Sequence, residues 1–141
     1  MIALRKYKIE DWSEIRDAAE PFMPPMPAKD FFEMSKRGIA VTATENGHTM
    51  ACGGIIYADD EGIVWLKMSE KCFEHSYRWA RTVKETFGLM KEAVGDLRIS
   101  TYILDNFCKG EKMARWIGLK RTDETGEYNG NAYHKYTAVV I

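Results

Sequence analysis

Apolar and polar positions change their period along the chain, and these changes divide it into strand and helix segments. Residues 39–68 alternate as strands do, in three runs separated by turn residues. An Asn-Gly pair at 46–47 is a strong hairpin signal, and the Asp-Glu-Gly run at 60–62 supplies a second turn. The third run, 63–68, is almost continuously apolar, which is typical of a central strand covered on both faces. The pattern predicts a three-strand antiparallel meander.

Shorter elements precede this meander. Residues 2–9 carry a strand pattern, and an Asp-Trp-Ser-Glu capping box at 11–14 predicts the start of a short helix. All four prolines lie in residues 21–27, so we expect a loop there. A second capping box at 30–33 predicts another short helix, which ends at Gly38.

A long helix and further strands follow the meander. Residues 76–94 place apolar side chains three and four positions apart, which predicts an amphipathic helix. Residues 97–104 alternate, and because they follow a crossover helix they should run parallel to an earlier strand. Asp105 and Asn106 are expected to cap a last helix, and a hairpin around the Asn-Gly pair at 129–130 completes the chain.

The predicted order of elements is β-α-α-β-β-β-α-β-α-β-β, which indicates an α+β fold with α/β/α layers around a mixed sheet. A chain of 141 residues can bury a core without disulfides or a metal, and we expect one domain over residues 1–141. The 20 basic and 21 acidic residues give a net charge of −1, which argues against nucleic acid as a bulk electrostatic partner. No apolar run is long enough for a membrane span.

Cysteines and histidines indicate no metal site. Cys52, Cys72 and Cys108 are far apart, and none of them forms a metal-ligand spacing with a histidine. His75 follows Cys72 by three residues, which is a weak nucleophile signal, and a structural thiol is the simpler interpretation. We expect reduced thiols and a cytoplasmic location.

The element order and three local motifs resemble the GNAT superfamily, the GCN5-related N-acetyltransferases, over essentially the whole chain. The sequence MACGGI at 50–55 is similar to the small-residue third strand of that family, and residues 63–68 are similar to its fourth strand. Asn106 followed by ARWIGLK at 114–120 is similar to its last helix. The resemblance implies a GNAT-like sheet and transfer of an acetyl group from acetyl-CoA to an amine. The sequence does not identify that amine acceptor.

In the GNAT family the acyl-CoA substrate lies in a gap between the splayed fourth and fifth strands. Its pantetheine pairs with the fourth strand, and backbone amides at the start of the next helix hold the pyrophosphate. Asn106 is either the family's cofactor-side asparagine or a plain helix cap. The resemblance implies six cofactor-binding residues: Leu66, Lys67, Met68, Ser76, Tyr77 and Asn106.

The sequence departs from the family in the segment that would hold the pyrophosphate. The family's loop contains small residues that allow backbone N–H groups to approach the phosphates. Residues 69–78 contain no glycine and include two acids, Glu70 and Glu74, which would repel a diphosphate unless they point away. Three basic side chains could offset that charge: Lys71, Arg78 and Arg81.

A second departure is Ala114, which stands where the family often has the tyrosine that protonates the leaving thiolate. Degenerate members of this kind resemble small GNAT-like proteins of tailed phages and prophages. The alternative hypothesis is therefore a catalytically silent structural or internal virion protein, with phage structural proteins as partners and the virion as its location.

No catalytic residue is assigned from the sequence. Glu61, Tyr102 and Asp105 are candidates for the general base, although turn and capping roles also explain the carboxylates. The Met- and Pro-rich segment 21–27 either walls the acceptor site or covers the edge of the core. The terminal sequence YTAVVI, 136–141, could pair across a homodimer as an exposed strand edge does.

Overall fold

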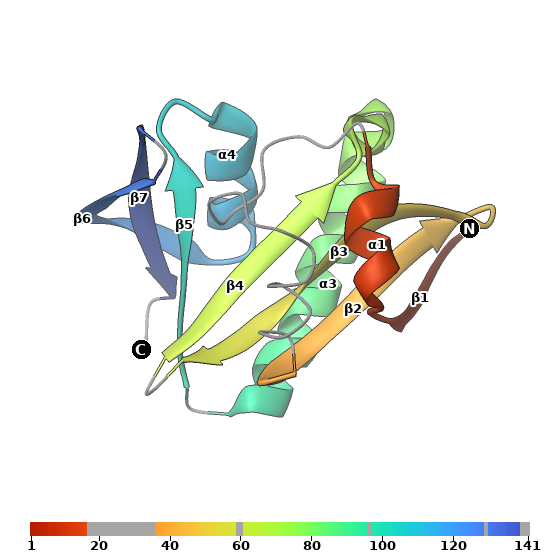
Figure 1. The fold of residues 1–141 in the computed structure, drawn as a ribbon, viewed down its shortest axis with the longest axis horizontal. Coiled ribbons are helices and arrows are strands. Elements are labelled where there is room, and N and C mark those ends of the chain that lie inside the picture. The colour runs from red at the N-terminus through yellow and green to blue at the C-terminus, as the bar shows by residue number, and fades with distance from the viewer. Residues whose placement is uncertain (17–35, 59–60, 96, 129, 139–141) are drawn as a thin grey trace.

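The computed structural model describes residues 1–16, 36–58, 61–95, 97–128 and 130–138, and these residues form a mixed sheet of seven strands with helices on both faces (Figure 1). The strands are β1 (Ile2–Lys6), β2 (Gly38–Glu45), β3 (His48–Ala58), β4 (Glu61–Met68), β5 (Arg98–Leu104), β6 (Leu119–Tyr128) and β7 (Asn131–Ala138). The helices are α1 (Ile9–Glu14), the 3-10 helix η1 (Glu70–His75), α3 (Ser76–Val94) and α4 (Cys108–Trp116).

The predicted meander is confirmed. Strands follow the order β1-β2-β3-β4-β5-β7-β6, and β2, β3 and β4 pair antiparallel as neighbours. Asn46 and Gly47 both have positive φ, 52° and 79°, as a tight hairpin turn requires. The predicted second turn is placed too late, because Glu61 and Gly62 already belong to β4. The predicted parallel strand is also confirmed, since β5 runs parallel to β4.

The sheet separates two hydrophobic clusters. Successive β4 side chains point to opposite faces, so Val64 and Met68 face α3 and α4 while Trp65 faces α1. All three are buried, which confirms β4 as a strand covered on both faces. The cluster on the α1 face consists of Tyr7, Trp12, Ile15, Cys52, Ile56 and Trp65.

Helix α1 begins earlier than predicted. Asp11 lies in its first turn and accepts the Lys8 N–H at 2.7 Å, whereas the sequence placed Asp11 at the cap position. The same carboxylate accepts hydrogen bonds from the Arg5 guanidinium and the Thr42 hydroxyl. These tertiary partners on β1 and β2 fix the helix start. The predicted proline loop and second helix lie outside the described residues.

The predicted cap of the last helix is wrong. Helix α4 has Phe107 as its N-cap residue, without a side-chain capping bond. Asn106 lies in the preceding turn with φ of 65°. The Asp105 carboxylate contacts His134 on β7 at 2.9 Å, and its N–H donates to the carbonyl of Ala132. Contacts to β7 therefore hold this turn in place, and the N-cap residue of α4 provides no side-chain hydrogen bond.

Strand β7 does not offer the edge that the dimer prediction needs. It lies between β5 and β6, and Tyr136 pairs with Thr101 on one side and with Arg121 on the other. In the described part of the sheet the edge strands are β1 and β6. Tyr136 and Thr137 are therefore paired on both sides within one chain, Ala138 is paired with Leu119 alone, and the final residues 139–141 lie outside the described ranges, so the homodimer stays a prediction.

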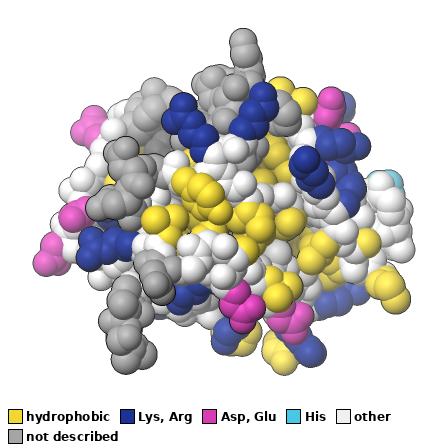
Figure 2. Space-filling model, turned by 90° about the horizontal axis from the view of Figure 1, so that it is seen from below, with side chains coloured by type: hydrophobic (Ala, Val, Ile, Leu, Met, Phe, Trp, Pro, Cys, Tyr) yellow, Lys and Arg dark blue, Asp and Glu magenta, His cyan; other side chains and the backbone are white. Residues whose placement is uncertain are grey.

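The surface carries charges of both signs. On the face seen from below Figure 1, hydrophobic side chains gather near the centre, and both basic and acidic side chains lie around them (Figure 2). This distribution agrees with the net charge of −1. Within the described ranges no helix has the length and apolar character that a membrane crossing requires.

Candidate functional site

A gap opens between the central strands β4 and β5. The two strands pair in parallel at three positions, Glu61–Ile63 with Arg98–Ser100. Beyond this point Thr101 donates its hydroxyl hydrogen to the carbonyl oxygen of Val64 at 2.7 Å. The strands then diverge toward their carboxyl ends, while β4 stays paired with β3 on its other side (Figure 1). The backbones of β4 and β5 are therefore unpaired with each other beyond Ile63 and Ser100, and we call this separated region the gap.

The backbone of β4 presents hydrogen-bonding groups to this gap. Peptide groups of successive strand residues point to alternate sides. The Val64 carbonyl faces β5, because Thr101 reaches it, and the Ser69 N–H faces β3, where it donates to Met50. Alternation therefore directs the N–H and C=O groups of Leu66 and Met68 into the gap. The N–H and C=O groups of Lys67, between them, point toward β3.

The three predicted β4 residues differ in where their side chains lie. Leu66 is half-buried against the cluster under α3, and Met68 is buried in that cluster. Lys67 leaves the sheet on the opposite face, where its Nζ donates to the carbonyl oxygen of Trp12 at 2.5 Å. The sequence prediction has the pantetheine run along all three residues. In the structure the side chain of Lys67 lies on the α1 face, opposite those of Leu66 and Met68.

The predicted pyrophosphate segment is helical. Residues Glu70–His75 form η1, and the Ser69 side chain accepts the N–H of Lys71 at 3.2 Å. Ser76 begins α3 and donates its hydroxyl hydrogen to the carbonyl of Phe73. Tyr77, at 74% exposure, is open to solvent. The two predicted residues therefore lie at an accessible helix start, and His75 provides no side-chain cap there.

The charged groups around this helix start have mixed arrangements. Glu70 and Glu74 are both exposed to solvent. Arg78 pairs with Glu45 at 2.7 Å, so part of its charge is already neutralised. Lys109 from α4 reaches the same region, with its Nζ 4.3 Å from the centre of the Phe73 ring. Asn106 is exposed in the turn before α4.

Glu61 lies at the closed end of the gap in a polar cluster. Its carboxylate accepts the hydroxyl hydrogen of the fully buried Ser100 and pairs with Lys135 on β7 at 3.0 Å. Burial lowers the pKa of Lys135, but the hydrogen bond and charge of Glu61, together with Tyr102 and Glu124, outweigh it, so the lysine pKa is raised overall. The Lys135 Nζ also lies 5.9 Å from the centre of the Tyr102 ring. A charged Lys135 holds Glu61 as its counter-ion, which weakens the case for Glu61 as a free base.

Two further candidates, Asp105 and Cys72, have structural partners. Asp105 is held by His134 at 2.9 Å. Cys72 is fully buried, with its sulfur 3.6 Å from the Met50 carbonyl oxygen, and the structural-thiol interpretation fits this position. Ala114 is buried in the core, so the helix that follows the gap offers no hydroxyl at that position.

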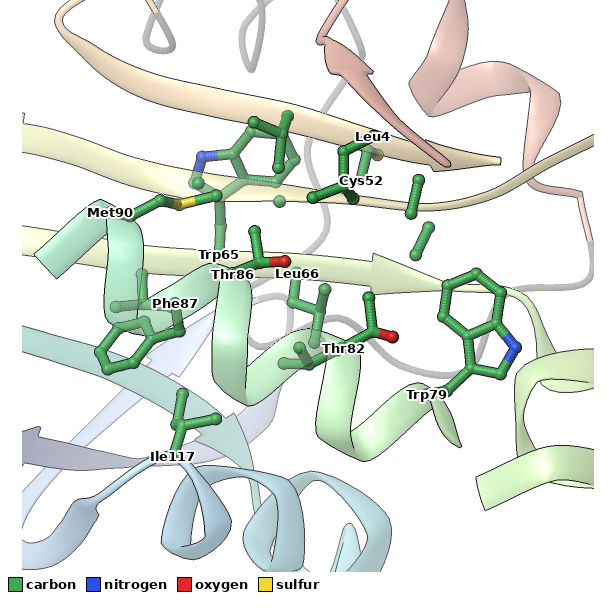
Figure 3. Close-up of a pocket in the computed structure, with 17 residues that line it drawn as sticks. Leu4, Cys52, Trp65, Leu66, Trp79, Thr82, Thr86, Phe87, Met90 and Ile117 are labelled. Carbon is green, nitrogen blue, oxygen red and sulfur yellow. The ribbon is translucent and has the colours of Figure 1, made fainter. Parts of the chain in front are cut away.

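A small apolar cavity lies between α3 and the sheet (Figure 3). Its volume is about 60 Å³, and the α3 side chains Thr82, Thr86 and Phe87 face β4 across it. Leu66, from the separated part of β4, lines one wall. A cavity with so few polar neighbours favours an apolar occupant over water.

Sequence reasoning missed the partners of the candidate bases. Ser100 and Lys135 surround Glu61, although 35 residues separate them and they belong to different strands. One signal in the sequence was available. Alternation along β5 places Ser100 and Tyr102 on one face of the strand, opposite its buried isoleucines. The strand order that brings Lys135 beside them was not readable from local pattern.

Comparison with known proteins gives a consistent fold and little sequence identity. No protein-family model matches the chain, and no curated protein matches its sequence. The ribosomal-protein-S18-alanine N-acetyltransferase from Escherichia coli has a TM-score of 0.70 at 12% identity, over 98% of this chain and 93% of that one. A GNAT-family acetyltransferase from Streptococcus pneumoniae has a TM-score of 0.71 at 11% identity, over 97% and 98%.

A further structural neighbour contains CoA. A chain of the NatC complex bound to Gag peptide and CoA has a TM-score of 0.74 at 11% identity, and the match covers 99% of both chains. The fold predicted from the sequence is confirmed, because the mixed seven-strand sheet with its helices matches the fold of solved GNAT acetyltransferases. Within the described residues no group of three His, Cys, Asp or Glu side chains could hold a metal ion.

Proposed function

We propose that the chain is an N-acetyltransferase that binds acetyl-CoA between β4 and β5 and transfers the acetyl group to an amine. One observation carries the proposal: the strands pair at three positions and then separate, and the peptide groups of Leu66 and Met68 point into the gap. An extended ligand can pair with such an edge as an added strand does. The neighbours that share this fold are N-acetyltransferases, one of them with bound CoA.

In this proposal the pantetheine arm lies along Leu66 and Met68, whose peptide groups face the gap, while the side chain of Lys67 stays bound to the Trp12 carbonyl on the α1 face. The phosphates lie at the start of α3, near Ser76 and Tyr77. The 19-residue helix directs the positive end of its dipole to that point. Asn106, exposed in the turn at the start of α4, would contact the ligand from the β5 side.

The chemistry needs little from side chains. A neutral amine attacks the thioester carbonyl carbon, the carbon–sulfur bond breaks, and the CoA thiolate takes the proton that the amine loses. The Met68 N–H, which faces the gap, is the candidate donor for the carbonyl oxygen. Because Glu61 is bound to Lys135 and Ala114 has no hydroxyl, water is the proposed route for the proton.

Calorimetric titration with acetyl-CoA and CoA tests the proposal. We expect saturable heat with both ligands and a rise in the melting temperature that grows with ligand concentration. The absence of both effects at millimolar ligand would exclude the acetyltransferase. That result would favour the alternative hypothesis of a silent virion module, which stays a prediction from the sequence.

Release of thiol in the presence of mixed primary amines tests turnover separately. One outcome is that the chain binds CoA and still releases thiol no faster than buffer alone with every amine tested. That result would make it a CoA-binding protein without transferase activity. The acceptor can then be narrowed by comparing N-terminal peptides with small polyamines in the same assay.

A further inference from the structure

The cavity under α3 lies beside the gap between β4 and β5. Val64 and Leu66 form its wall on the β4 side, and Ile117 lines it from the end of α4 (Figure 3). Helix α4 packs against β5, so the cavity has a wall on each side of the gap. No other strand lies between β4 and β5 in the described sheet. The space under α3 therefore borders the α3 face of the gap.

Leu66 belongs to both the gap and the cavity. Its peptide N–H and C=O groups point into the gap, by the alternation that the Val64 carbonyl and the Ser69 N–H establish. Its side chain lies on the α3 face, where it packs against the main core cluster and lines the cavity. A thioester that pairs with the Leu66 peptide group would thus place its acyl chain next to the cavity.

The lining of the cavity is suited to a hydrocarbon chain. Val83 and Phe87 contribute apolar side chains from α3. The Thr82 hydroxyl donates to the Arg78 carbonyl within the helix, so its hydrogen is already used there. The indole nitrogen of Trp79 points away from the other labelled side chains of the lining (Figure 3). An apolar cavity of this kind stays dry and takes an apolar ligand.

The volume of the cavity sets the size of this ligand. In another protein, an apolar cavity of about 150 Å³ holds one benzene molecule, which has six carbon atoms. By the same measure the volume of about 60 Å³ found here holds about two carbon atoms. We propose that the cavity receives the end of the acyl chain, so that the preferred donor is a four-carbon thioester, butyryl-CoA, over acetyl-CoA. This inference rests on the proposed function, in which the thioester lies in the gap.

The reaction is the one proposed for acetyl-CoA, with two more methylene groups on the transferred chain. The amine attacks the thioester carbonyl carbon, the carbon–sulfur bond breaks, and the CoA thiolate takes the proton that the amine loses. The two added methylene groups leave water and fill a void whose walls otherwise lack contacts. Each buried methylene group tightens binding about fourfold, which gives about fifteenfold for butyryl-CoA over acetyl-CoA.

Calorimetric titration of the full chain with CoA and with acetyl-, propionyl-, butyryl- and hexanoyl-CoA tests the inference. We expect the dissociation constant to fall about fourfold from acetyl- to propionyl-CoA and again from propionyl- to butyryl-CoA. Hexanoyl-CoA should bind no more tightly than butyryl-CoA, because two further carbon atoms exceed the volume of the cavity. A maximum at four carbon atoms distinguishes this cavity from a general apolar surface, on which affinity would continue to rise with chain length.

Ala51→Val fills the cavity from β3 and provides a second measurement. Ala51 is buried in the cavity wall, and valine adds two carbon atoms there, about the number that the cavity holds. We expect the advantage of butyryl-CoA to fall from about fifteenfold to about one- to twofold, with the affinity for acetyl-CoA unchanged. Ala3→Val is the matched control, because Ala3 is exposed on β1 and does not line the cavity. This control should keep the full advantage of butyryl-CoA.

The outcomes separate this inference from the proposed function. If acetyl-CoA binds and butyryl-CoA binds no more tightly, or if hexanoyl-CoA binds more tightly than butyryl-CoA, the acyl cavity is excluded and the acetyltransferase stands. If none of the CoA ligands binds, both are excluded. An advantage of butyryl-CoA that Ala51→Val leaves intact would also exclude the cavity as its cause. The series on the wild-type chain needs no variant, so its result does not depend on the folding of Ala51→Val.

Discussion

Thr101 and Val64 join β5 to β4 at the point where the two strands begin to separate. The Thr101 hydroxyl donates to the Val64 carbonyl oxygen at 2.7 Å, and both residues are buried. A side chain thus satisfies a backbone acceptor that the neighbouring strand no longer reaches. This hydrogen bond marks the closed end of the gap in which we place the acyl-CoA.

Thr101→Val should test this junction. Valine has nearly the same shape, but it leaves the buried Val64 carbonyl without its donor, which costs about 1–3 kcal/mol of unfolding free energy. The matched control is Thr82→Val, since the Thr82 hydroxyl donates to the Arg78 carbonyl inside α3, where the helix already supplies a donor. Urea unfolding of both variants measures the difference. Equal losses would show that the junction bond contributes nothing specific.

Ser76→Glu should weaken CoA binding about five- to tenfold, because it adds a negative charge at the helix start where the phosphates would lie. Leu89→Glu adds the same charge to an exposed position of the same helix. That position lies about 20 Å further along the axis, beyond the screening length, and should leave the affinity unchanged. Calorimetry measures both. A loss for Leu89→Glu as large as for Ser76→Glu would place the phosphates elsewhere.

Much of the fold was readable because its signals are local. Alternation and the Asn46-Gly47 turn were enough for the meander, and apolar spacing gave the bounds of α3, Ser76–Val94, as the structure has them. Parallel pairing of β5 followed from the crossover helix. Each of these inferences depends on neighbours in the sequence.

The errors share a different cause. The sequence predicts Asp11 as a helix cap, but its buried carboxylate accepts hydrogen bonds from Arg5 on β1 and Thr42 on β2. The sequence also predicts Asn106 as a cap, whereas the contact of Asp105 with His134 on β7 holds that turn. The direction of the β4 peptide groups likewise depends on which strand lies on each side. Non-local pairing decides these features, and periodicity does not report it.

Gly54→Ala should destabilise the chain strongly. A Cβ at this position of β3 would lie 2.1 Å from the carbonyl oxygen of Ile39 and 2.8 Å from the Cα of Ala40, both backbone atoms of β2. Such a clash forces the two strands apart, and we expect a loss of about 3 kcal/mol. Gly126→Ala on β6 is the control, because a Cβ there meets no atom within 4 Å. Thermal melts of the two variants should differ by several degrees, and similar melting temperatures would contradict the close approach of β2 and β3.

Asp11 should make the stability of the chain depend on acidity. Burial raises the pKa of this carboxyl, but hydrogen bonds from Arg5, Thr42 and the Lys8 N–H lower it more, so the folded pKa is below the ordinary value. The unfolded chain therefore binds this proton first as the pH falls. The stabilisation is complete above the ordinary aspartate pKa of about 4 and is lost as the pH falls through the lower folded pKa.

Asp11→Asn should remove this dependence. At neutral pH the variant should lose about 2–3 kcal/mol of unfolding free energy, the scale of hydrogen bonds to a charged group. As the pH falls below about 4, the wild-type chain should lose that advantage and the two stabilities should converge. Asp123→Asn, at an exposed position of β6, is the control and should follow the wild-type curve. Urea unfolding at a series of pH values measures all three chains, and a constant gap between wild type and Asp11→Asn would show that the ion pair contributes no charge-dependent stability.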